Sequence, residues 1–287
     1  MNLLTIADLD AAALTQLLDL SKRDLGTPLA GRGVALLFEK PSARTRNSME
    51  MAVIQLGGHP VYIQKDEVGL GTRETPEDVA RTLACYHAII AARVAAHAHL
   101  DAMAAATDAP VLNMLSERAH PLQALADLLT IRQLAGRIEG VRIAYVGDAN
   151  NVCRSLAEGC SKLGAELTVA SPEGYGFEPA ELARMPGVRQ VVDPADAVAG
   201  AKFVYTDVWV SMGQGDEVDA RRTAFANHQV TRQVMARTDD AWFLHCLPAH
   251  RGEEVAADVI DGLASAVWQQ ATNRMHSARA ALAWLVT

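Results

Sequence analysis

The 287-residue chain has no run of basic residues, no C-x-x-C pair and no apolar stretch as long as a membrane span. Its net charge is −8, so it lacks the positive patch that binds a phosphate backbone, and we expect no nucleic-acid partner. A membrane span needs about 20 apolar residues, and the first 20 residues carry acidic side chains where a signal peptide carries basic ones. We therefore expect a cytoplasmic protein with no membrane partner.

The four cysteines are too widely spaced for a disulfide framework or a zinc cluster, both of which use closely spaced pairs. They are Cys85, Cys153, Cys160 and Cys246. His97 and His99 stand two residues apart, and side chains at that spacing do not share a face of a strand or of a helix. The sequence thus predicts reduced thiols and no metal.

Short apolar runs alternate with longer segments of helical period, which predicts an α/β protein with mainly parallel sheets. The predicted strands are Val34–Phe38, Val61–Gln64, Ile89–Arg93, Val111–Leu115, Arg142–Val146, Leu167–Ala170, Val188–Val192, Phe203–Val208 and Trp242–Leu247. The predicted helices are Arg46–Gln55, Thr75–Cys85, Gln123–Leu134, Arg154–Leu163 and Pro179–Arg184. A turn-rich segment at Leu134–Gly140 divides the chain into two halves. The amphipathic last segment, Ser265–Thr287, could pack on either half.

The segment Phe38–Glu50, FEKPSARTRNSME, joins a strand end to a helix start. A helix N-terminus presents unpaired backbone N–H groups, to which Ser42 and Thr45 add hydroxyls. Arg44 or Arg46 adds a planar cation. This combination is typical of a phosphate site. The alternative is an N-cap serine followed by arginines in solvent.

A second polar group is predicted at the same edge of the sheet. Arg93 ends one predicted strand, and His120 and Gln123 follow the next. Because the carboxyl ends of parallel strands form the ligand-binding edge, these side chains suit a carbonyl group that must be polarised. A turn in which Pro121 starts a helix accounts for His120 equally well.

The segment Tyr145–Leu156, YVGDANNVCRSL, resembles a nucleotide-binding turn but lacks the G-x-G-x-x-G spacing that a dinucleotide needs. Asn150 and Asn151, at the predicted helix start, could hold a small polar ligand. Asn150 could equally be the helix cap.

Two later strands end in side chains that could meet a substrate amine. Asp207 ends one strand, and a loop with Ser211 and Met212 follows it. Cys246 ends the last strand, just before Pro248. Reactive groups occupy such positions, although a lone cysteine is more often a small buried apolar residue.

Together these segments resemble the aspartate/ornithine carbamoyltransferase family, and most closely its ornithine branch. The stretches FEKPSARTR and HPLQ are similar to the carbamoyl phosphate signature, and DVWVSMG and HCLP are similar to the ornithine branch. The resemblance implies two doubly wound parallel-sheet domains joined by interdomain helices. Residues 1–135 would bind carbamoyl phosphate, residues 136–265 would bind ornithine, and residues 266–287 would form a helix that packs back on the first domain. It also implies a homotrimer in which each site borrows a loop from a neighbouring subunit.

The implied activity is carbamoyl transfer to the side-chain amine of L-ornithine, which gives citrulline for arginine biosynthesis without a cofactor. The residues implied to bind carbamoyl phosphate are Ser42, Ala43 through its backbone, Arg44, Thr45, Arg93, His120, Gln123 and Arg274. The residues implied to bind ornithine are Asn151, Asp207, Ser211, Met212, Cys246 and Leu247. Arg93, His120 and Cys246 would be catalytic, and either the Cys246 thiolate or the leaving phosphate would accept the amine proton.

Two positions depart from the family pattern. Ala43 stands where the signature usually has threonine, and Glu67, in the loop 65–74, stands where the ornithine branch commonly has glutamine. A carboxylate beside a phosphate is repulsive unless it is paired, here by Lys65 or Arg73.

Other functions stay open at the level of sequence. A relative that acts on putrescine or an N-acylornithine would keep most of this pattern. A dinucleotide-dependent oxidoreductase is opposed by the missing glycines, and a non-catalytic relative is supported only by Ala43 and Glu67.

Overall fold

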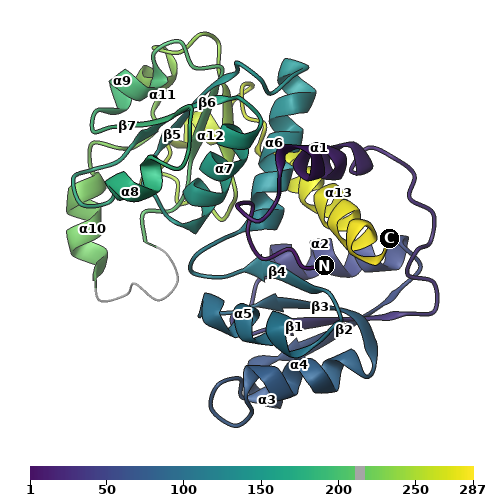
Figure 1. Ribbon diagram of the computed structural model, residues 1–287. Coiled ribbons are helices and arrows are strands. Elements are labelled where there is room, and N and C mark those ends of the chain that lie inside the picture. The colour runs from purple at the N-terminus through teal and green to yellow at the C-terminus, as the bar shows by residue number, and fades with distance from the viewer. Residues whose placement is uncertain (211–216) are drawn as a thin grey trace. The chain divides into compact units, whose positions relative to one another are not determined.

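The structure, a computed structural model, describes residues 1–210 and 217–287 (Figure 1). It forms two compact units. The first unit consists of Met1–Leu129 and Thr272–Thr287, and the second unit consists of Thr130–Ala271. Helices α6, Pro121–Ala135, and α13, Val267–Val286, each have residues in both units. None of the helices in the described part of the chain combines the length and the apolar character of a membrane span.

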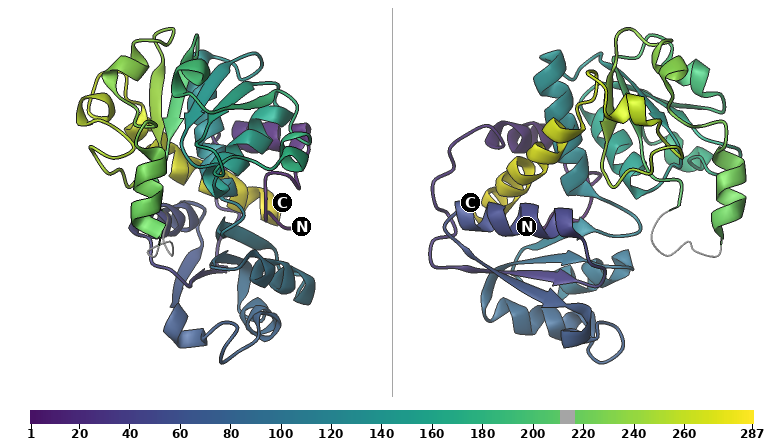
Figure 2. Two further views of the ribbon diagram at one scale, coloured as in Figure 1. Left: turned by 90° about the vertical axis from the view of Figure 1, so that its left-hand side faces the viewer. Right: turned by 180° about the vertical axis from the view of Figure 1, so that it is seen from behind.

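The first unit is built on a parallel sheet of four strands in the order β2-β1-β3-β4. The strands are β1 Gly33–Phe38, β2 His59–Gln64, β3 His87–Arg93 and β4 Val111–Leu115. Its other helices are α1 Ala11–Leu20, α2 Ala43–Gln55, α3 Lys65–Val68, α4 Pro76–Ala84 and α5 His97–Ala106. Helices α4 and α5 cover one face of this sheet and α2 covers the other (Figure 2).

Covering both faces explains why the strands are continuously apolar. In β1, Ala35 and Leu37 pack into a buried cluster with residues of α4 and α5, such as Val79 and Leu100. Leu36, between them in the strand, is also fully buried. Because successive side chains point to opposite faces, Leu36 lies on the side that α2 covers.

The second unit has a parallel sheet of five strands in the order β7-β6-β5-β8-β9. The strands are β5 Arg142–Val146, β6 Glu166–Ala170, β7 Val188–Val191, β8 Phe203–Thr206 and β9 Trp242–His245. The helices are α7 Asn151–Lys162, α8 Pro179–Leu182, α9 Pro194–Val198, α10 Val218–Phe225, α11 Arg232–Met235 and α12 Ala257–Ile260. Ala144 and Val146 pack in one cluster with residues of α9, whereas Tyr145 points to the other face.

The predicted fold class is confirmed, because both sheets are parallel and each predicted strand is present. Three strands end earlier than predicted, and one of them, Val188–Val192, stops at Val191. Phe203–Val208 stops at Thr206 and Trp242–Leu247 stops at His245. After Thr206 and after His245 the chain leaves the sheet, although the sequence still has apolar residues there. Asp207 and Cys246 therefore lie at the edge of the sheet.

Candidate active site

Each sheet contains one point where the order of strand addition reverses, and ligands of open α/β sheets bind beside the strand ends at such a point. In the first unit the reversal lies between β1 and β3, where Phe38 is paired with Arg93. In the second unit it lies between β5 and β8, where Tyr145 is paired with Tyr205. Most of the predicted site residues follow these strand ends.

In the first unit, Ser42 caps helix α2. Its hydroxyl accepts the backbone N–H of Thr45 at 3.3 Å, and the two hydroxyl oxygens lie 3.2 Å apart. The helix therefore begins at Ala43, three residues before the predicted start. Thr45 is buried on the first turn, whereas Ala43 and Arg44 are exposed.

Arg46 is engaged on the surface of α2. Its Nε donates to Glu50 at 2.8 Å, and its guanidinium lies 3.9 Å from the centre of the Tyr62 ring. The sequence predicts either Arg44 or Arg46 as the cation that binds a phosphate. Of these two, Arg46 already contacts neighbouring side chains of its own unit.

Two arginines from distant parts of the chain converge on the Thr45 hydroxyl. Arg93, the last residue of β3, places Nη1 3.4 Å from Thr45 Oγ1, and Arg274, on α13, places Nη2 3.5 Å from the same atom. Both side chains are buried. Arginine stays charged in proteins, so this group concentrates two positive charges beside the N-terminus of a helix. Such an arrangement attracts an anion.

Arg274 also contacts His120 and Gln123. It donates to Gln123 Oε1 and lies 3.1 Å from His120 Nε2. Because a guanidinium has only donors, Nε2 accepts this bond and the ring proton lies on Nδ1. Burial lowers the pKa of His120 well below its ordinary value of 6.5, and the charges of Arg274 and Arg93 lower it further. His120 is therefore neutral at neutral pH.

The amide of Gln123 is fixed at both ends. Its Oε1 accepts from Arg274, and its Nε2 donates to Asp127 Oδ1 at 2.7 Å. Both Gln123 and Asp127 are buried on α6. The structure thus brings Thr45, Arg93, His120, Gln123 and Arg274 together in one unit.

The contacts within the loop 65–74 show what the Glu67 carboxylate binds. The Glu67 carboxylate accepts the backbone N–H of Gln64 at 2.8 Å and completes a capping box at the start of α3. Arg73 donates to the backbone carbonyl of Glu67 and pairs with the carboxylate of Glu74 at 3.2 Å. The carboxylate of Glu67 therefore stabilises its own helix, and Arg73 neutralises Glu74 instead.

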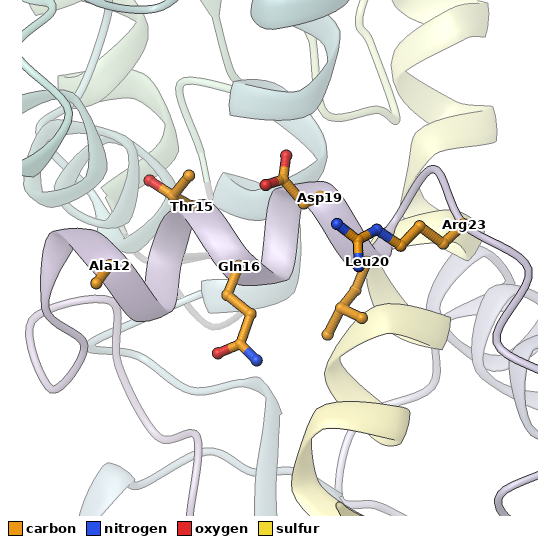
Figure 3. A pocket seen from close by; sticks show the side chains of 6 residues that line it. All are labelled: Ala12, Thr15, Gln16, Asp19, Leu20 and Arg23. Carbon is orange, nitrogen blue, oxygen red and sulfur yellow. The ribbon is translucent and has the colours of Figure 1, made fainter.

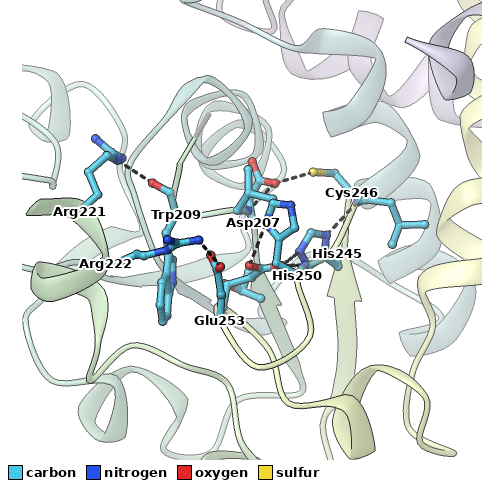
Figure 4. A network of polar contacts seen from close by, with 12 residues as sticks. Asp207, Trp209, Arg221, Arg222, His245, Cys246, His250 and Glu253 are labelled. Atoms are coloured by element: carbon cyan, nitrogen blue, oxygen red, sulfur yellow. Dashed lines mark hydrogen bonds and ion pairs between the residues drawn. The ribbon is translucent and has the colours of Figure 1, made fainter. Parts of the chain in front are cut away.

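In the second unit, strand register brings Asp207 and Cys246 together. Thr206 is paired with His245, so the residue after each strand end leaves the sheet beside the other. Cys246 Sγ donates to Asp207 Oδ1 at 3.0 Å (Figure 4). The backbone N–H of Val208 donates to the same oxygen at 2.8 Å.

Asn150 holds the other oxygen of Asp207, and sequence reasoning considered it only as a ligand or a cap. Its Nδ2 donates to Asp207 Oδ2 at 2.9 Å, while its Oδ1 accepts the N–H groups of Val152 and Cys153 at the start of α7. Asn150 is thus both the helix cap and a donor to the site. Asn151, one of the residues predicted to bind ornithine, is the first residue of α7.

Tyr145 was not singled out from sequence. Its hydroxyl lies 3.5 Å from Asn150 Oδ1, and burial raises its pKa well above 10, an effect to which the charge of Asp207 adds. The hydroxyl therefore stays protonated and can donate. A buried tyrosine at the end of a strand was the only available signal.

The turn after β9 is held by His245. Its Nδ1 accepts the backbone N–H of Leu247 at 2.8 Å, so the ring proton lies on Nε2, which is 3.1 Å from Glu254 Oε1. Leu247 has a positive φ of 59°, which few residues other than glycine adopt. Ser211 and Met212, the remaining predicted ornithine contacts, lie outside the described residues.

Two groups of possible metal ligands occur among the described residues. Ligand atoms of Asp207, His245 and Cys246 lie within 4.8 Å of one another, as do those of a second group, His250, Glu253 and Glu254. The hydrogen bond between Cys246 and Asp207 accounts for the proximity of these two residues without an ion.

A surface pocket of about 420 Å³ lies on α1 (Figure 3). It is lined by Ala12, Thr15, Gln16, Asp19, Leu20 and Arg23. It contains none of the residues predicted to act on a substrate, and we assign no role to it.

Known proteins are similar to this chain in both of its halves. Residues 1–133 match the carbamoyl-P binding domain, and residues 139–285 match the Asp/Orn binding domain, of aspartate/ornithine carbamoyltransferase. The chain is 47% identical to the ornithine carbamoyltransferase of Acidothermus cellulolyticus over 96% of this chain and 92% of that protein. It is 44% identical to the enzyme of that name from Thermus thermophilus, over 99% of this chain and 96% of that protein.

A solved structure agrees with the sequence matches. This chain superimposes on the crystal structure of ornithine carbamoyltransferase from Thermus thermophilus with a TM-score of 0.93 and 42% sequence identity. The match covers 100% of this chain and 99% of the other. The matches extend through both domains and include nearly all of the chain. The chain therefore belongs to the aspartate/ornithine carbamoyltransferase family.

Proposed function

We propose that the protein transfers the carbamoyl group of carbamoyl phosphate to the side-chain amine of L-ornithine, giving L-citrulline and phosphate. One observation carries the proposal. A single chain holds two buried cations at the switch point of one sheet and a carboxylate bonded to a thiol at the switch point of the other. The first group suits an anionic donor, and the second suits a cationic amino acid.

Carbamoyl phosphate binds to the first unit in this proposal. Residues that surround the N-terminus of α2 hold the phosphate group; they are Ser42, the backbone N–H of Ala43, Arg44, Thr45, Arg93 and Arg274. Helix N–H groups and guanidiniums together favour a phosphate strongly. The convergence of Arg93 and Arg274 on the Thr45 hydroxyl supports this assignment.

Arg93 and His120 polarise the carbamoyl carbonyl. Attack by the amine places negative charge on the carbonyl oxygen, and preorganised donors lower the barrier by stabilising that charge. His120 is neutral, so it acts as a hydrogen-bond donor rather than as an acid. Gln123, whose amide is already fixed by its neighbours, binds the carbamoyl NH₂ group.

Ornithine binds to the second unit. Asn151 takes the carboxylate, Asp207 and Ser211 take the α-amino group, and Met212 packs along the side chain. The Cys246 thiol and the Leu247 carbonyl lie beside the reacting amine. The orientation of Asp207, fixed by Asn150 and Cys246, supports this reading.

The reacting amine must lose a proton before it attacks, because its pKa in water is about 10.4. The thiolate of Cys246, which lies beside Asp207, is one acceptor of this proton, and the leaving phosphate is the other. In the transfer, the amine nitrogen forms a bond to the carbonyl carbon, and the bond from that carbon to the phosphate oxygen breaks. The oxygen keeps the electron pair. No metal or organic cofactor takes part in the proposed steps.

We also infer the setting of the reaction from the family. The chain forms a homotrimer, in which the loop 65–74 reaches the site of a neighbouring subunit. It works in the cytoplasm and supplies citrulline to arginine biosynthesis.

The test is citrulline formation from carbamoyl phosphate, with L-ornithine compared against putrescine, N-acetylornithine and aspartate. We expect strong preference for ornithine. Arg93→Ala should lower the rate by about 10²- to 10³-fold, the usual cost of removing one donor to a developing oxyanion. Arg46→Ala is the matched control, because Arg46 pairs with Glu50 on the surface of α2.

Each other outcome has a defined meaning. Preference for putrescine or N-acetylornithine would keep the carbamoyl phosphate site but refute the role given to Asp207, since neither substrate has a free α-amino acid end. Binding of carbamoyl phosphate without turnover of any amine would identify a non-catalytic relative.

A further inference from the structure

Arg221, on α10, is buried although it has no place in the reaction described above. Its Nε donates to the backbone carbonyl of Trp209 at 2.6 Å (Figure 4). Its Nη2 donates to the carboxylate of Asp148. The guanidinium also lies 4.9 Å from the centre of the Tyr175 ring and 5.5 Å from that of Phe225. Arg221 thus bonds to one residue 73 positions earlier in the chain and to another 12 positions earlier.

Both hydrogen-bonded partners belong to segments that carry the proposed ornithine contacts. Asp148 lies in the turn after β5, two residues before Asn150, and Trp209 lies two residues after Asp207. The Asp148 turn is also fixed by the backbone N–H of Ala149, which donates to the carbonyl of Tyr175 at 3.0 Å. The position of Arg221 therefore determines how far the two segments stand apart.

The charges in this region make the arginine necessary. Burial raises the pKa of Asp148, the charge of Arg221 opposes that rise, and the nearby charge of Asp207 adds to it. Without the guanidinium, the carboxylates of Asp148 and Asp207 would repel each other near the turn that contains Asn150. A buried charge that loses its partner is strongly destabilising.

We propose that Arg221 is a positioning residue that sets the geometry of the α-amino and α-carboxylate contacts by clamping the Asp148 turn to the segment after β8. The inference rests on the proposed function and deepens it. Arg221 touches neither substrate and acts through Asp148 and Trp209. It governs recognition of the amino-acid end of ornithine rather than the transfer of the carbamoyl group.

A lysine cannot replace this arginine. The planar guanidinium donates in two directions while its faces lie near aromatic rings, whereas an ammonium is a point charge on a flexible stem. Lysine would keep one bond, to Asp148 or to Trp209, and lose the other.

The experiment compares Arg221→Met, Arg221→Lys and Asp148→Asn with the parent protein in steady-state kinetics. We expect the KM for ornithine to rise about tenfold to a hundredfold in Arg221→Met, which corresponds to the loss of one or two hydrogen bonds to a charged group. The KM for ornithine of Arg221→Lys should lie between that of the parent protein and that of Arg221→Met. The KM for carbamoyl phosphate should stay unchanged in all three variants, and kcat should change less than the KM for ornithine.

L-Norvaline is a direct probe, because it has the α-amino and α-carboxylate groups of ornithine but no side-chain amine. Its inhibition constant should rise in parallel with the KM for ornithine. Adding Asp148→Asn to Arg221→Met should restore part of the affinity, because it removes the unpaired carboxylate. A purely structural role would instead raise both KM values together and give no such rescue.

Arg222→Gln is the control, since Arg222 is the next residue of α10 but pairs with Glu253 on the surface at 2.7 Å. It should leave both KM values within about twofold of the parent, as surface substitutions usually do. An unchanged KM for ornithine in both Arg221→Lys and Asp148→Asn would refute the inference even if Arg221→Met did not fold. If the parent protein made no citrulline, the proposed function would fail, and calorimetric binding of L-ornithine and L-norvaline would still decide the role of Arg221.

Discussion

Single side chains with two hydrogen-bonding tasks hold the candidate site residues of the second unit in place. Asn150 uses its oxygen to cap α7 and its nitrogen to orient Asp207. The two tasks can be separated, because asparagine and aspartate are equally good helix caps, but only asparagine has a donor.

Asn150→Asp should keep the cap of helix α7 and lose the hydrogen bond to Asp207. The new carboxylate can still accept the N–H groups of Val152 and Cys153, but it faces the carboxylate of Asp207 with no proton to share. We expect a fall in ornithine affinity. In Asn150→Ala, the loss of the cap should also cost about 1 kcal/mol of stability. Thermal unfolding and the KM for ornithine, measured on both variants, check the prediction; equal loss of stability in the two would contradict it.

His120 should make the stability of the protein fall at acid pH. Its pKa is lowered in the folded state, so below pH 6.5 the unfolded chain binds a proton that the folded chain does not. Stability therefore decreases as the pH falls from 6.5 toward the folded-state pKa. His120→Gln should flatten this decrease. Urea unfolding between pH 5 and pH 8 measures the slope, and identical slopes for the two proteins would show that His120 is not buried as described.

At the scale of elements, strands were easier to predict from sequence than helices. A strand covered on both faces is a continuous apolar run, and β1 and β5 show this clearly. Helix α5 was missed because it begins with His97 and His99, whose imidazoles obscure the period. Helix boundaries depend on caps such as Ser42, which the apolar pattern does not reveal.

Helix α13 packs on the first unit through its second half. Ser277 Oγ donates to the carbonyl of Leu122 at 3.2 Å, and Leu282 is fully buried. Leu282→Ala should therefore destabilise the protein by about 2 to 5 kcal/mol, the usual cost of truncating a buried leucine. Trp268, at the other end of the same helix, is 64% exposed. Trp268→Ala should change stability by less than about 0.5 kcal/mol, and denaturant unfolding of both variants distinguishes the two positions.

At the scale of the whole molecule, a homotrimer predicts a mass of three times the 30.7 kDa of one chain. Light scattering on the purified protein measures it directly. Met51 and Ile54 lie three residues apart on α2 and are 44% and 53% exposed, and apolar side chains at that spacing share a helix face. Such a face is suited to a subunit contact. A monomeric mass at micromolar concentration would contradict the prediction.

The sequence predicts which residue types form the site better than it predicts which of those residues contact one another. Asp207 and Cys246 could be recognised as polar residues at strand ends, and the register of β8 and β9 explains why they meet. Arg274 could be placed only by resemblance, because its contact with Thr45 joins residues 229 positions apart. Arg221 gave no signal, since an arginine inside a helical pattern usually lies in solvent.

The two guanidiniums at Thr45 also have a consequence for handling the protein. A buried site with two positive charges attracts whatever small anion is abundant, so sulfate or phosphate in a purification buffer will act as a counter-ion there. Such anions will raise the melting temperature by mass action and compete with the donor substrate. Initial rates should accordingly be measured in a buffer of bulky organic anions, and the slowing caused by added inorganic phosphate then reports how strongly the site retains its own product.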